Sequence, residues 1–330
     1  MSKVISVVTG GAGFIGSHLV DLLLDQGHNV RVIDNFSGGH ESNLTHNLNN
    51  PNLEIFRENI LDLQADSEIF HSATYVFHLA GIGDIVPSIE KPDEYMKVNV
   101  QGTVRVLECS RFNNVSKFVY ASSSSCYGLA ATPTSESAPI LPKYPYALSK
   151  NMGEQAVFHW NNVYGLKANA VCIFNAYGPR VRTTGAYGAV FGVFLKQKLA
   201  GKPFTVVGDG SQLRDFVYVT DVAKAFLLAA TSNVSGERFN LGGGNPQSIN
   251  SLVKILGGPV VYLPKRPGEP DATHADITKI TSLLGWQPEV TFSQGVGLMI
   301  KNISDWENAP LWEPESIAKA TQTWFKFMDR

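Results

Sequence analysis

The chain has 330 residues, of which 44% are apolar and 17% charged, with 27 basic and 29 acidic side chains. This composition is typical of a globular protein, and the length fits about two domains or one large α/β unit with a lobe. The near-neutral balance argues against a nucleic-acid partner, and no apolar run reaches the ~18 residues of a membrane span. Three scattered cysteines predict neither disulfides nor a zinc site, so we expect a metal-free cytoplasmic protein.

Short apolar runs alternate with longer amphipathic stretches through the first half of the chain. This alternation predicts an α/β fold, a doubly wound Rossmann domain with a parallel sheet, whose ligands bind at the carboxyl ends of the strands. The predicted strands are Ile5–Val8, Val30–Ile33, Leu53–Phe56, Tyr75–Leu79, Lys117–Ser122 and Lys167–Phe174. The predicted helices are Gly13–Gln26, Ser67–His71, Tyr95–Arg111 and Tyr146–Val163.

The alternation weakens after Gly178, where proline and glycine interrupt the sequence more often. We therefore expect a Rossmann domain over residues 1–175 and a smaller, mixed α/β lobe for the substrate over 176–330. Segments around 214–242 are expected to return to the first domain. Residues 308–330 have the pattern of an amphipathic helix, for which the sequence suggests packing on the second lobe and no function.

Three glycines separate the first predicted strand from the first helix, namely Gly10, Gly13 and Gly16. Glycine permits a positive φ and a close approach of backbone N–H groups to a pyrophosphate, and the helix N-terminus adds positive potential. Asp34 ends the second strand, 18 residues after Gly16. An acidic residue there accepts hydrogen bonds from an adenosine ribose and repels a 2′-phosphate, which favours NAD over NADP. The alternative is a glycine turn with a purely structural role.

A tyrosine and a lysine, Tyr146 and Lys150, are spaced to lie on one face of a helix. A tyrosine acts as a base only if its pKa falls from about 10 towards 7, which a nearby lysine and a cationic nicotinamide would promote. On its own this pair could be two surface residues. The serines Ser123, Ser124 and Ser125, which follow a predicted strand, make a reactive site the better interpretation.

In combination these motifs resemble the extended short-chain dehydrogenase/reductase family, and within it the nucleotide-sugar epimerases and dehydratases. The resemblance covers nearly the whole chain. Further segments that resemble the family's motifs are Phe77–Gly81, Asn99–Thr103, Phe174–Arg180, Gly208–Asp221 and Arg266–Glu269 with Ala275–Asp276. One departure is Asn59, which stands before Ile60 where many relatives have aspartate.

The resemblance implies a role for individual residues. The catalytic residues would be Ser123, Tyr146 and Lys150. NAD would be contacted by Gly10, Gly13, Phe14, Ile15, Gly16, Asp34, Asn35, Asn59, Ile60, Leu79, Ala80, Gly81, Asn99, Tyr146, Lys150 and Phe174. A nucleotide-diphosphate sugar would be contacted by Ser124, Ser125, Asn175, Thr205, Val207, Arg214, Arg266, Glu269 and Thr273. The family also implies a homodimer formed through the helices at Tyr95–Arg111 and Tyr146–Val163.

The serines at the strand end bear on the reaction. Dehydratases of the family carry Thr-Asp-Glu there and decarboxylases Thr-Ser-Glu, whereas Ser123–Ser125 is similar to the 4-epimerases. Water loss needs an acid that protonates the leaving hydroxyl, and these serines supply none. We therefore expect 4-epimerisation of a UDP-hexose or UDP-N-acetylhexosamine. The alternatives are another NDP-sugar epimerase, a 4-ketosugar reductase, a 4,6-dehydratase, or a non-catalytic NAD-binding regulator.

Overall fold

The computed structural model describes residues 3–183 and 190–328. Its larger unit is built on a seven-stranded sheet in the order β11-β6-β5-β4-β1-β2-β3, with all neighbours parallel. The strands are β1 (Ile5–Thr9), β2 (Asn29–Ile33), β3 (Leu53–Phe56), β4 (Tyr75–His78), β5 (Lys117–Ser123), β6 (Ala168–Ile173) and β11 (Glu237–Leu241). The predicted fold class is confirmed, and all six predicted strands are present. The strand order reverses between β1 and β4, where doubly wound sheets bind their ligands.

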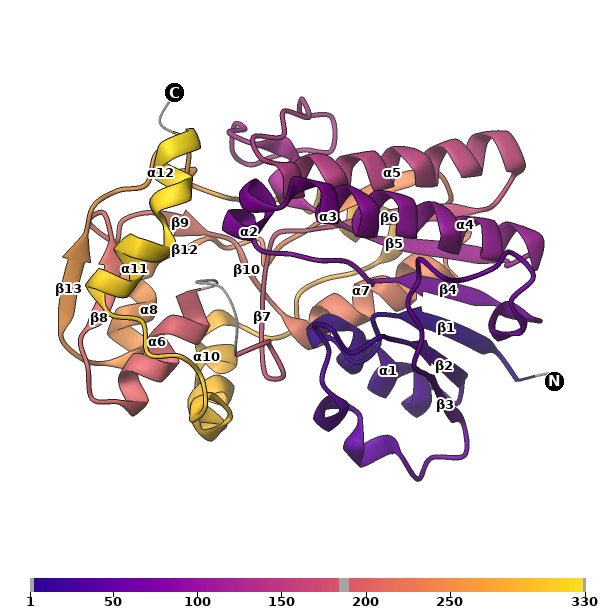
Figure 1. Ribbon diagram of the computed structural model, residues 1–330, viewed down its shortest axis with the longest axis horizontal. Coiled ribbons are helices and arrows are strands. Elements are labelled where there is room, and N and C mark those ends of the chain that lie inside the picture. The colour runs from indigo at the N-terminus through magenta and orange to yellow at the C-terminus, as the bar shows by residue number, and fades with distance from the viewer. Residues whose placement is uncertain (1–2, 184–189, 329–330) are drawn as a thin grey trace.

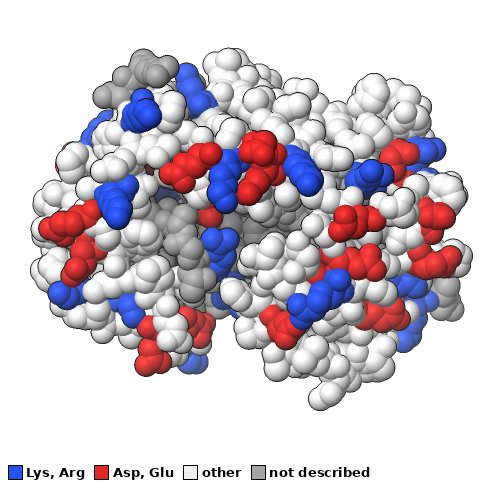
Figure 2. Space-filling view, in the orientation of Figure 1, with Lys and Arg blue, Asp and Glu red and all other residues white. Residues whose placement is uncertain are grey.

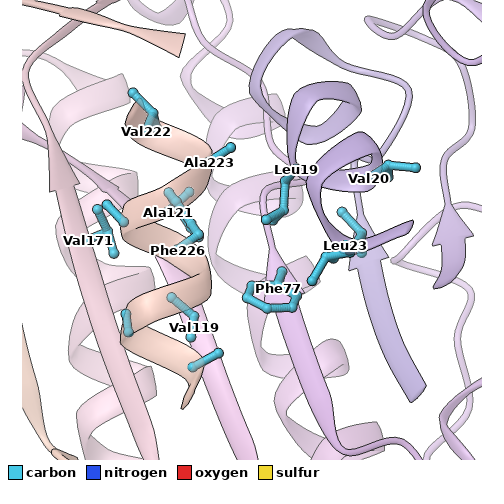
Figure 3. Close-up of a cluster of buried hydrophobic side chains, with 14 of the residues drawn as sticks. Leu19, Val20, Leu23, Phe77, Val119, Ala121, Val171, Val222, Ala223 and Phe226 are labelled. Atoms are coloured by element: carbon cyan, nitrogen blue, oxygen red, sulfur yellow. The ribbon is translucent and has the colours of Figure 1, made fainter. Parts of the chain in front are cut away.

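Helices cover both faces of this sheet (Figure 1). Helices α1 (Phe14–Asp25) and α7 (Val219–Thr231) pack on one face, and α4 (Gly102–Phe112) and α5 (Pro145–Tyr164) on the other. Figure 3 shows the first face, with Leu19, Leu23 and Phe226 of the helices above Phe77 and Val119 of the strands. Because successive strand residues face opposite ways, a strand buried on both faces is apolar throughout.

Two predicted helices differ from the structure. The segment Ser67–His71 contains only a short 3-10 turn, Glu68–Phe70, so the predicted α-helix there is wrong. Five residues with one buried apolar pair do not provide enough burial to offset helix nucleation. The helix predicted at Tyr95–Arg111 comprises α3 (Pro92–Met96), a π-helical turn at Lys97–Gln101, and α4.

The second half of the chain folds mainly as a separate lobe around aromatic side chains such as Tyr177, Phe191, Phe216 and Phe292. Its small sheets pair β8 (Phe204–Val207) with β13 (Val260–Leu263), β9 (Leu213–Arg214) with β12 (Gln247–Ser248), and β7 (Asn175–Tyr177) with β10 (Phe216–Tyr218). Its helices are α6 (Val190–Leu199), α8 (Ile249–Leu256), α10 (Phe292–Lys301), α11 (Pro314–Ala320) and α12 (Gln322–Met328). Helix α9 (Thr278–Leu284), in contrast, packs beside α7 and β11 on the first unit.

The surface shown in Figure 2 carries acidic and basic side chains interspersed, with a hollow between the two halves of the molecule. Over residues 3–183 and 190–328, no helix is both long and apolar enough to cross a bilayer.

Candidate active site

The glycine turn after β1 is packed so closely that larger residues do not fit. Gly10 has a φ of +72°, and a Cβ there would lie 2.7 Å from the backbone nitrogen of Ala80. A Cβ on Gly16 would lie 2.1 Å from the carbonyl oxygen of Gly10. Gly13 is the N-cap of α1 and has no side chain with which to cap it. The N–H groups of the first turn, which includes Phe14 and Ile15, have no intrahelical acceptor because no helical carbonyl precedes them. Since no side chain caps them either, they can bind an anion.

The carboxylate of Asp34 is held next to this turn. Its Oδ2 accepts a hydrogen bond of 2.9 Å from the amide of Ala12, and its Oδ1 one of 2.8 Å from the amide of Phe36. Burial raises the pKa of Asp34, and these two amides oppose that rise. The second strand thus ends in a carboxylate of fixed orientation that can accept hydrogen bonds. It lies beside the glycine turn Gly10–Gly16, which is called the cradle below.

The segment after β4 forms the other side of the cradle. Leu79 and Ala80 lead to Gly81, where a Cβ would lie 3.0 Å from Oδ1 of Asn99 and 4.0 Å from Nζ of Lys150. The Asn99 amide fixes this segment, because its Oδ1 accepts from the Ile82 amide (2.8 Å) and its Nδ2 donates to the Ile82 carbonyl (3.0 Å). Several predicted cofactor residues thus meet at one strand edge.

Other predicted cofactor residues are engaged within the protein. Asn35 is exposed and accepts from Ser37, while Asn59 accepts from the amide of Leu61. Ile60 is 5% exposed and belongs to the core, where its side chain packs beside α4. That these three residues contact a cofactor stays a prediction. Such contacts would use the backbone or the outer edge of the side chain.

The predicted catalytic residues come together where β5 ends and α5 begins. The hydroxyl of Ser123 accepts from the amide of Ser125 (3.2 Å). Burial raises the pKa of Tyr146, and its hydrogen bond with Ser123 opposes that rise. Burial lowers the pKa of Lys150 to about 8. The Lys150 ammonium lies 4.4 Å from the centre of the Tyr120 ring, a cation–π contact.

One turn beyond Lys150 on α5 lies Glu154, whose importance the sequence analysis missed. It is 1% exposed and accepts from Nε of Arg238 on β11 at 2.6 Å, and also from the Ser122 hydroxyl. Its charge raises the pKa of Lys150 and so opposes the effect of burial. The spacing of four residues from Lys150 was the signal that could have identified it.

A cavity of about 490 Å³ lies between the two lobes. All of the predicted catalytic and substrate residues except Lys150 line it, together with Phe174; they are Ser123, Ser124, Ser125, Tyr146, Asn175, Thr205, Val207, Arg214, Arg266, Glu269 and Thr273. Asp84, Tyr144 and Trp324 form a further part of the wall that was not predicted from the sequence. No local motif connects these three, because they meet only in the folded chain.

Three charged side chains on one wall of the cavity lie close together. NH2 of Arg214 donates to Oε1 of Glu269 at 2.7 Å, and NH1 of Arg266 lies 3.8 Å from its other oxygen. The Thr273 hydroxyl donates to Oδ1 of Asn175 at 2.8 Å. Glu269 therefore balances two arginines on one wall of the cavity and holds them ready for an anion.

Thr205 is placed differently from its neighbours in the cavity wall. Its amide donates to Oε1 of Gln197 on α6 (3.1 Å), and its hydroxyl accepts from Nε2 of the same residue (2.9 Å). The amide is therefore occupied inside the lobe, whereas the hydroxyl keeps its own proton to donate. Thr205 lines the cavity, and its contact with a substrate stays a prediction.

The sequence model of the NAD dependent epimerase/dehydratase family matches residues 6–242. The chain belongs to this family. It is therefore an enzyme whose cofactor is NAD.

Individual members of the family are similar over most of this chain. A UDP-glucose 4-epimerase of Mycolicibacterium smegmatis is 37% identical over 90% of this chain and 97% of that protein. A solved UDP-N-acetylglucosamine 4-epimerase from Methanobrevibacter ruminantium M1, in complex with UDP-N-acetylmuramic acid, is 34% identical and covers 92% of this chain and 100% of its own, with a TM-score of 0.85. A solved UDP-glucuronic acid 4-epimerase from Bacillus cereus, with UDP-glucuronic acid and NAD, is 31% identical over 91% and 99%, with a TM-score of 0.85.

The cradle described above fits the family's cofactor. A pyrophosphate is accommodated where Gly10 and Gly16 exclude any Cβ and the first-turn N–H groups of α1 are free of intrahelical partners. The Asp34 carboxylate stands where an adenosine ribose needs an acceptor. Lys150 lies close to Gly81, since a Cβ there would be 4.0 Å from its Nζ.

Proposed function

We propose that this protein is an NAD-dependent 4-epimerase of a UDP-hexose or UDP-N-acetylhexosamine. The observation that carries the proposal is the serine run Ser123–Ser125, which lines the same cavity as Tyr146 and the pair of arginines Arg214 and Arg266. The serines provide hydrogen bonds to a sugar without an acid for water loss, and the arginines match a diphosphate.

Tyr146 is the proposed base, with its phenolate accepting the proton of the sugar C4 hydroxyl. Ser123 hydrogen-bonds to the same oxygen and keeps it next to the phenol. Bound NAD supplies the hydride acceptor and donor of the reaction. Because burial raises the pKa of Tyr146, the phenolate needs nearby positive charge, and Lys150 is the resident cation on the same helix face. Glu154, one turn further along, helps Lys150 to remain protonated.

Arg214 and Arg266 are the proposed diphosphate ligands. In the structure both are turned towards Glu269, at 2.7 and 3.8 Å. An arriving diphosphate would compete for the same guanidinium N–H groups and release the carboxylate to accept from the ribose hydroxyls. Asn175 is the proposed further donor to a phosphate oxygen.

Ser124, Ser125 and Thr273 are the proposed contacts around C2 of the sugar. Thr273 is smaller than the tyrosine of some glucose-restricted members of the family and leaves room for an N-acetyl group. Asp84 also lines this cavity, 3.7 Å from the guanidinium of Arg182, and its charge adds to the rise that burial causes in the pKa of Tyr146.

Among the described residues that line the cavity near Tyr146, only Asp84 supports the alternative, a 4,6-dehydratase. Burial raises the pKa of this carboxyl, as an acid catalyst requires, although the charge of Arg182 opposes the rise.

The proposal is tested by incubating the purified protein with a panel of nucleotide sugars and no added NAD, and identifying the products by NMR. An epimerase gives the C4 epimer without consuming cofactor. Products lacking one water would indicate the dehydratase. A requirement for stoichiometric NADPH would indicate a 4-ketosugar reductase, and NAD binding without any turnover would indicate a regulator.

We also propose a homodimer formed through α4 and α5. Large apolar side chains are exposed along these helices: Leu148 (40%), Met152 (39%), Val163 (57%) and Tyr164 (51%) on α5, and Phe112 (56%) on α4. Exposed apolar side chains of this size are typical of an interface. Light scattering on the protein and on Met152→Lys tests it.

The described cysteines are free and buried, which fits the cytoplasmic location that we expect.

A further inference from the structure

The C-terminal helix α12 connects the two sides of the cavity. On one side, the Thr323 hydroxyl donates to Oε1 of Glu90 (2.9 Å) at the end of α2 (Ile85–Glu90), a helix that enters the cavity wall. On the other side, the Trp324 indole N–H donates to the carbonyl of Pro267 (2.7 Å). Figure 1 shows α12 lying next to α2. The helix is therefore more than packing for the second lobe.

Trp324 itself forms part of the cavity wall. It is 6% exposed, and its ring centre lies 6.1 Å from that of Tyr144, two residues before Tyr146. Burial raises the pKa of Tyr144, and a hydrogen bond with Ser125 opposes that rise; both residues line the cavity. The two aromatic rings thus form a continuous surface from the serine run to Pro267.

The loop that Trp324 holds is also held at its far end, where Arg214 donates to Glu269 and, at 3.0 Å, to the Pro270 carbonyl. It runs from Arg266 to Pro270, and Pro267 and Pro270 have no N–H with which to form a backbone hydrogen bond. Gly268, between them, has a φ of +71°. Met328, one turn after Trp324, packs on the same loop, since a Cβ on Gly268 would lie 3.3 Å from its terminal methyl. The loop carries Arg266 and Glu269, which face the cavity.

We propose that Trp324 is a positioning residue for nucleotide-sugar binding, fixing the Arg266–Pro270 loop so that the arginine pair is preorganised for a diphosphate. This inference rests on the proposed function. The reacting C4 oxygen is at Tyr146, which the indole does not touch, so the loop should act equally on ground state and transition state. Such uniform binding changes KM and leaves kcat in place.

Trp324→Phe tests the inference, because it keeps an aromatic ring against Tyr144 and removes the N–H to Pro267. One hydrogen bond of about 1.4 kcal/mol corresponds to a tenfold change in affinity. We expect the Kd for UDP, measured by calorimetry, and the KM for the UDP-sugar to rise about tenfold, with kcat within about twofold of wild type. Phe327→Leu is the matched control, because Phe327 lies on the same helix, 45% exposed, outside the cavity lining.

Hydrogen exchange of residues 265–271 gives a second measurement that needs no turnover, and we expect it to accelerate in Trp324→Phe and to be unchanged in Phe327→Leu. An unchanged Kd and unchanged loop exchange would overturn the inference, and so would a loss of kcat at constant KM. A general loss of thermal stability, together with a rise in KM and a fall in kcat of similar size, would show a merely structural role and overturn the inference. If the wild-type protein binds neither UDP nor any UDP-sugar, the proposed function fails, a result visible before any variant is made.

Discussion

The cofactor side and the substrate side of the cleft are built in different ways. On the cofactor side, Gly10, Asp34 and Gly81 follow β1, β2 and β4, which are neighbours in one sheet, and their positions are set by backbone geometry. On the substrate side, the cavity wall is made from segments as distant as Ser123–Ser125, Arg266–Thr273 and Trp324. There the side chains bind one another, as Arg214 and Glu269 do at 2.7 Å.

This difference indicates two kinds of preorganisation. Backbone N–H groups at a helix N-terminus present their charge without any partner to displace. An arginine paired with a carboxylate must exchange partners when a diphosphate arrives, so part of its binding energy is used for that exchange. We therefore expect substitutions on the cofactor side to act as all-or-none changes, and substitutions on the substrate side to change affinity and selectivity by degrees.

The largest effect is expected for Tyr146→Phe, at the junction of the two sides. It removes the proposed base and keeps the ring, so kcat should fall by about 10²–10⁴-fold while the Kd for UDP-sugar changes little. Steady-state kinetics and calorimetry measure the two quantities. Tyr164→Phe, at the exposed end of the same helix, is the control and should retain full activity. Wild-type turnover in Tyr146→Phe would exclude the mechanism.

A steric block of the cradle comes next. In Gly16→Ala the new Cβ would lie 2.1 Å from the Gly10 carbonyl oxygen, so the turn must open. We expect purified wild-type protein to carry NAD(H), and this variant to lose it almost completely, with affinity reduced about 10²-fold. Absorbance and chromatography of the released nucleotide measure the content. Gly38→Ala is the control, since nothing lies within 4 Å of a Cβ there. Normal NAD content in Gly16→Ala would show that the cradle lies elsewhere.

What the sequence predicts follows the same division. The Gly10–Gly16 turn, Asp34 and the Tyr146–Lys150 pair could be predicted because each is local: a strand end, a helix start, one helical face. The pairing of Arg214 with Glu269 could not, because it depends on how two distant loops meet. Trp324 was seen only as part of an amphipathic pattern, and its approach to Tyr144 is a property of the assembled lobes. The engagement of Thr205 by Gln197 was hidden for the same reason.

A smaller, graded effect is expected at Thr273 on the substrate side. Thr273→Tyr adds a ring at the proposed C2 wall, so kcat/KM should fall about tenfold more for the UDP-N-acetylhexosamines than for UDP-glucose and UDP-galactose. The hydroxyl also binds Asn175 at 2.8 Å, and its loss should affect both pairs of sugars. Thr273→Val, which removes the hydroxyl at nearly constant volume, measures that common part. If Thr273→Tyr and Thr273→Val lower both sugar pairs equally, the steric argument is wrong.

The smallest expected effect concerns the stability that is lost because the Lys150 ammonium is buried on the cofactor side of the cleft. Burial lowers its pKa from 10.5 to about 8. Between these two pH values the unfolded chain binds more protons than the folded one, so the unfolding free energy rises with pH across this window, and below pH 8 the penalty is present in full. In NAD-free protein at pH 7, Lys150→Met should therefore raise Tm, by about 1–2 °C for each kcal/mol relieved, while abolishing turnover. The gain should shrink as the pH rises from 8 towards 10.5, where both proteins bury a neutral side chain. Calorimetry across this range measures it, with the exposed Lys301→Met as the control.

A lower Tm for Lys150→Met at pH 7 would mean that the attraction of the ammonium to the Tyr120 ring and to Glu154 outweighs its burial, and that the active-site lysine stabilises the fold.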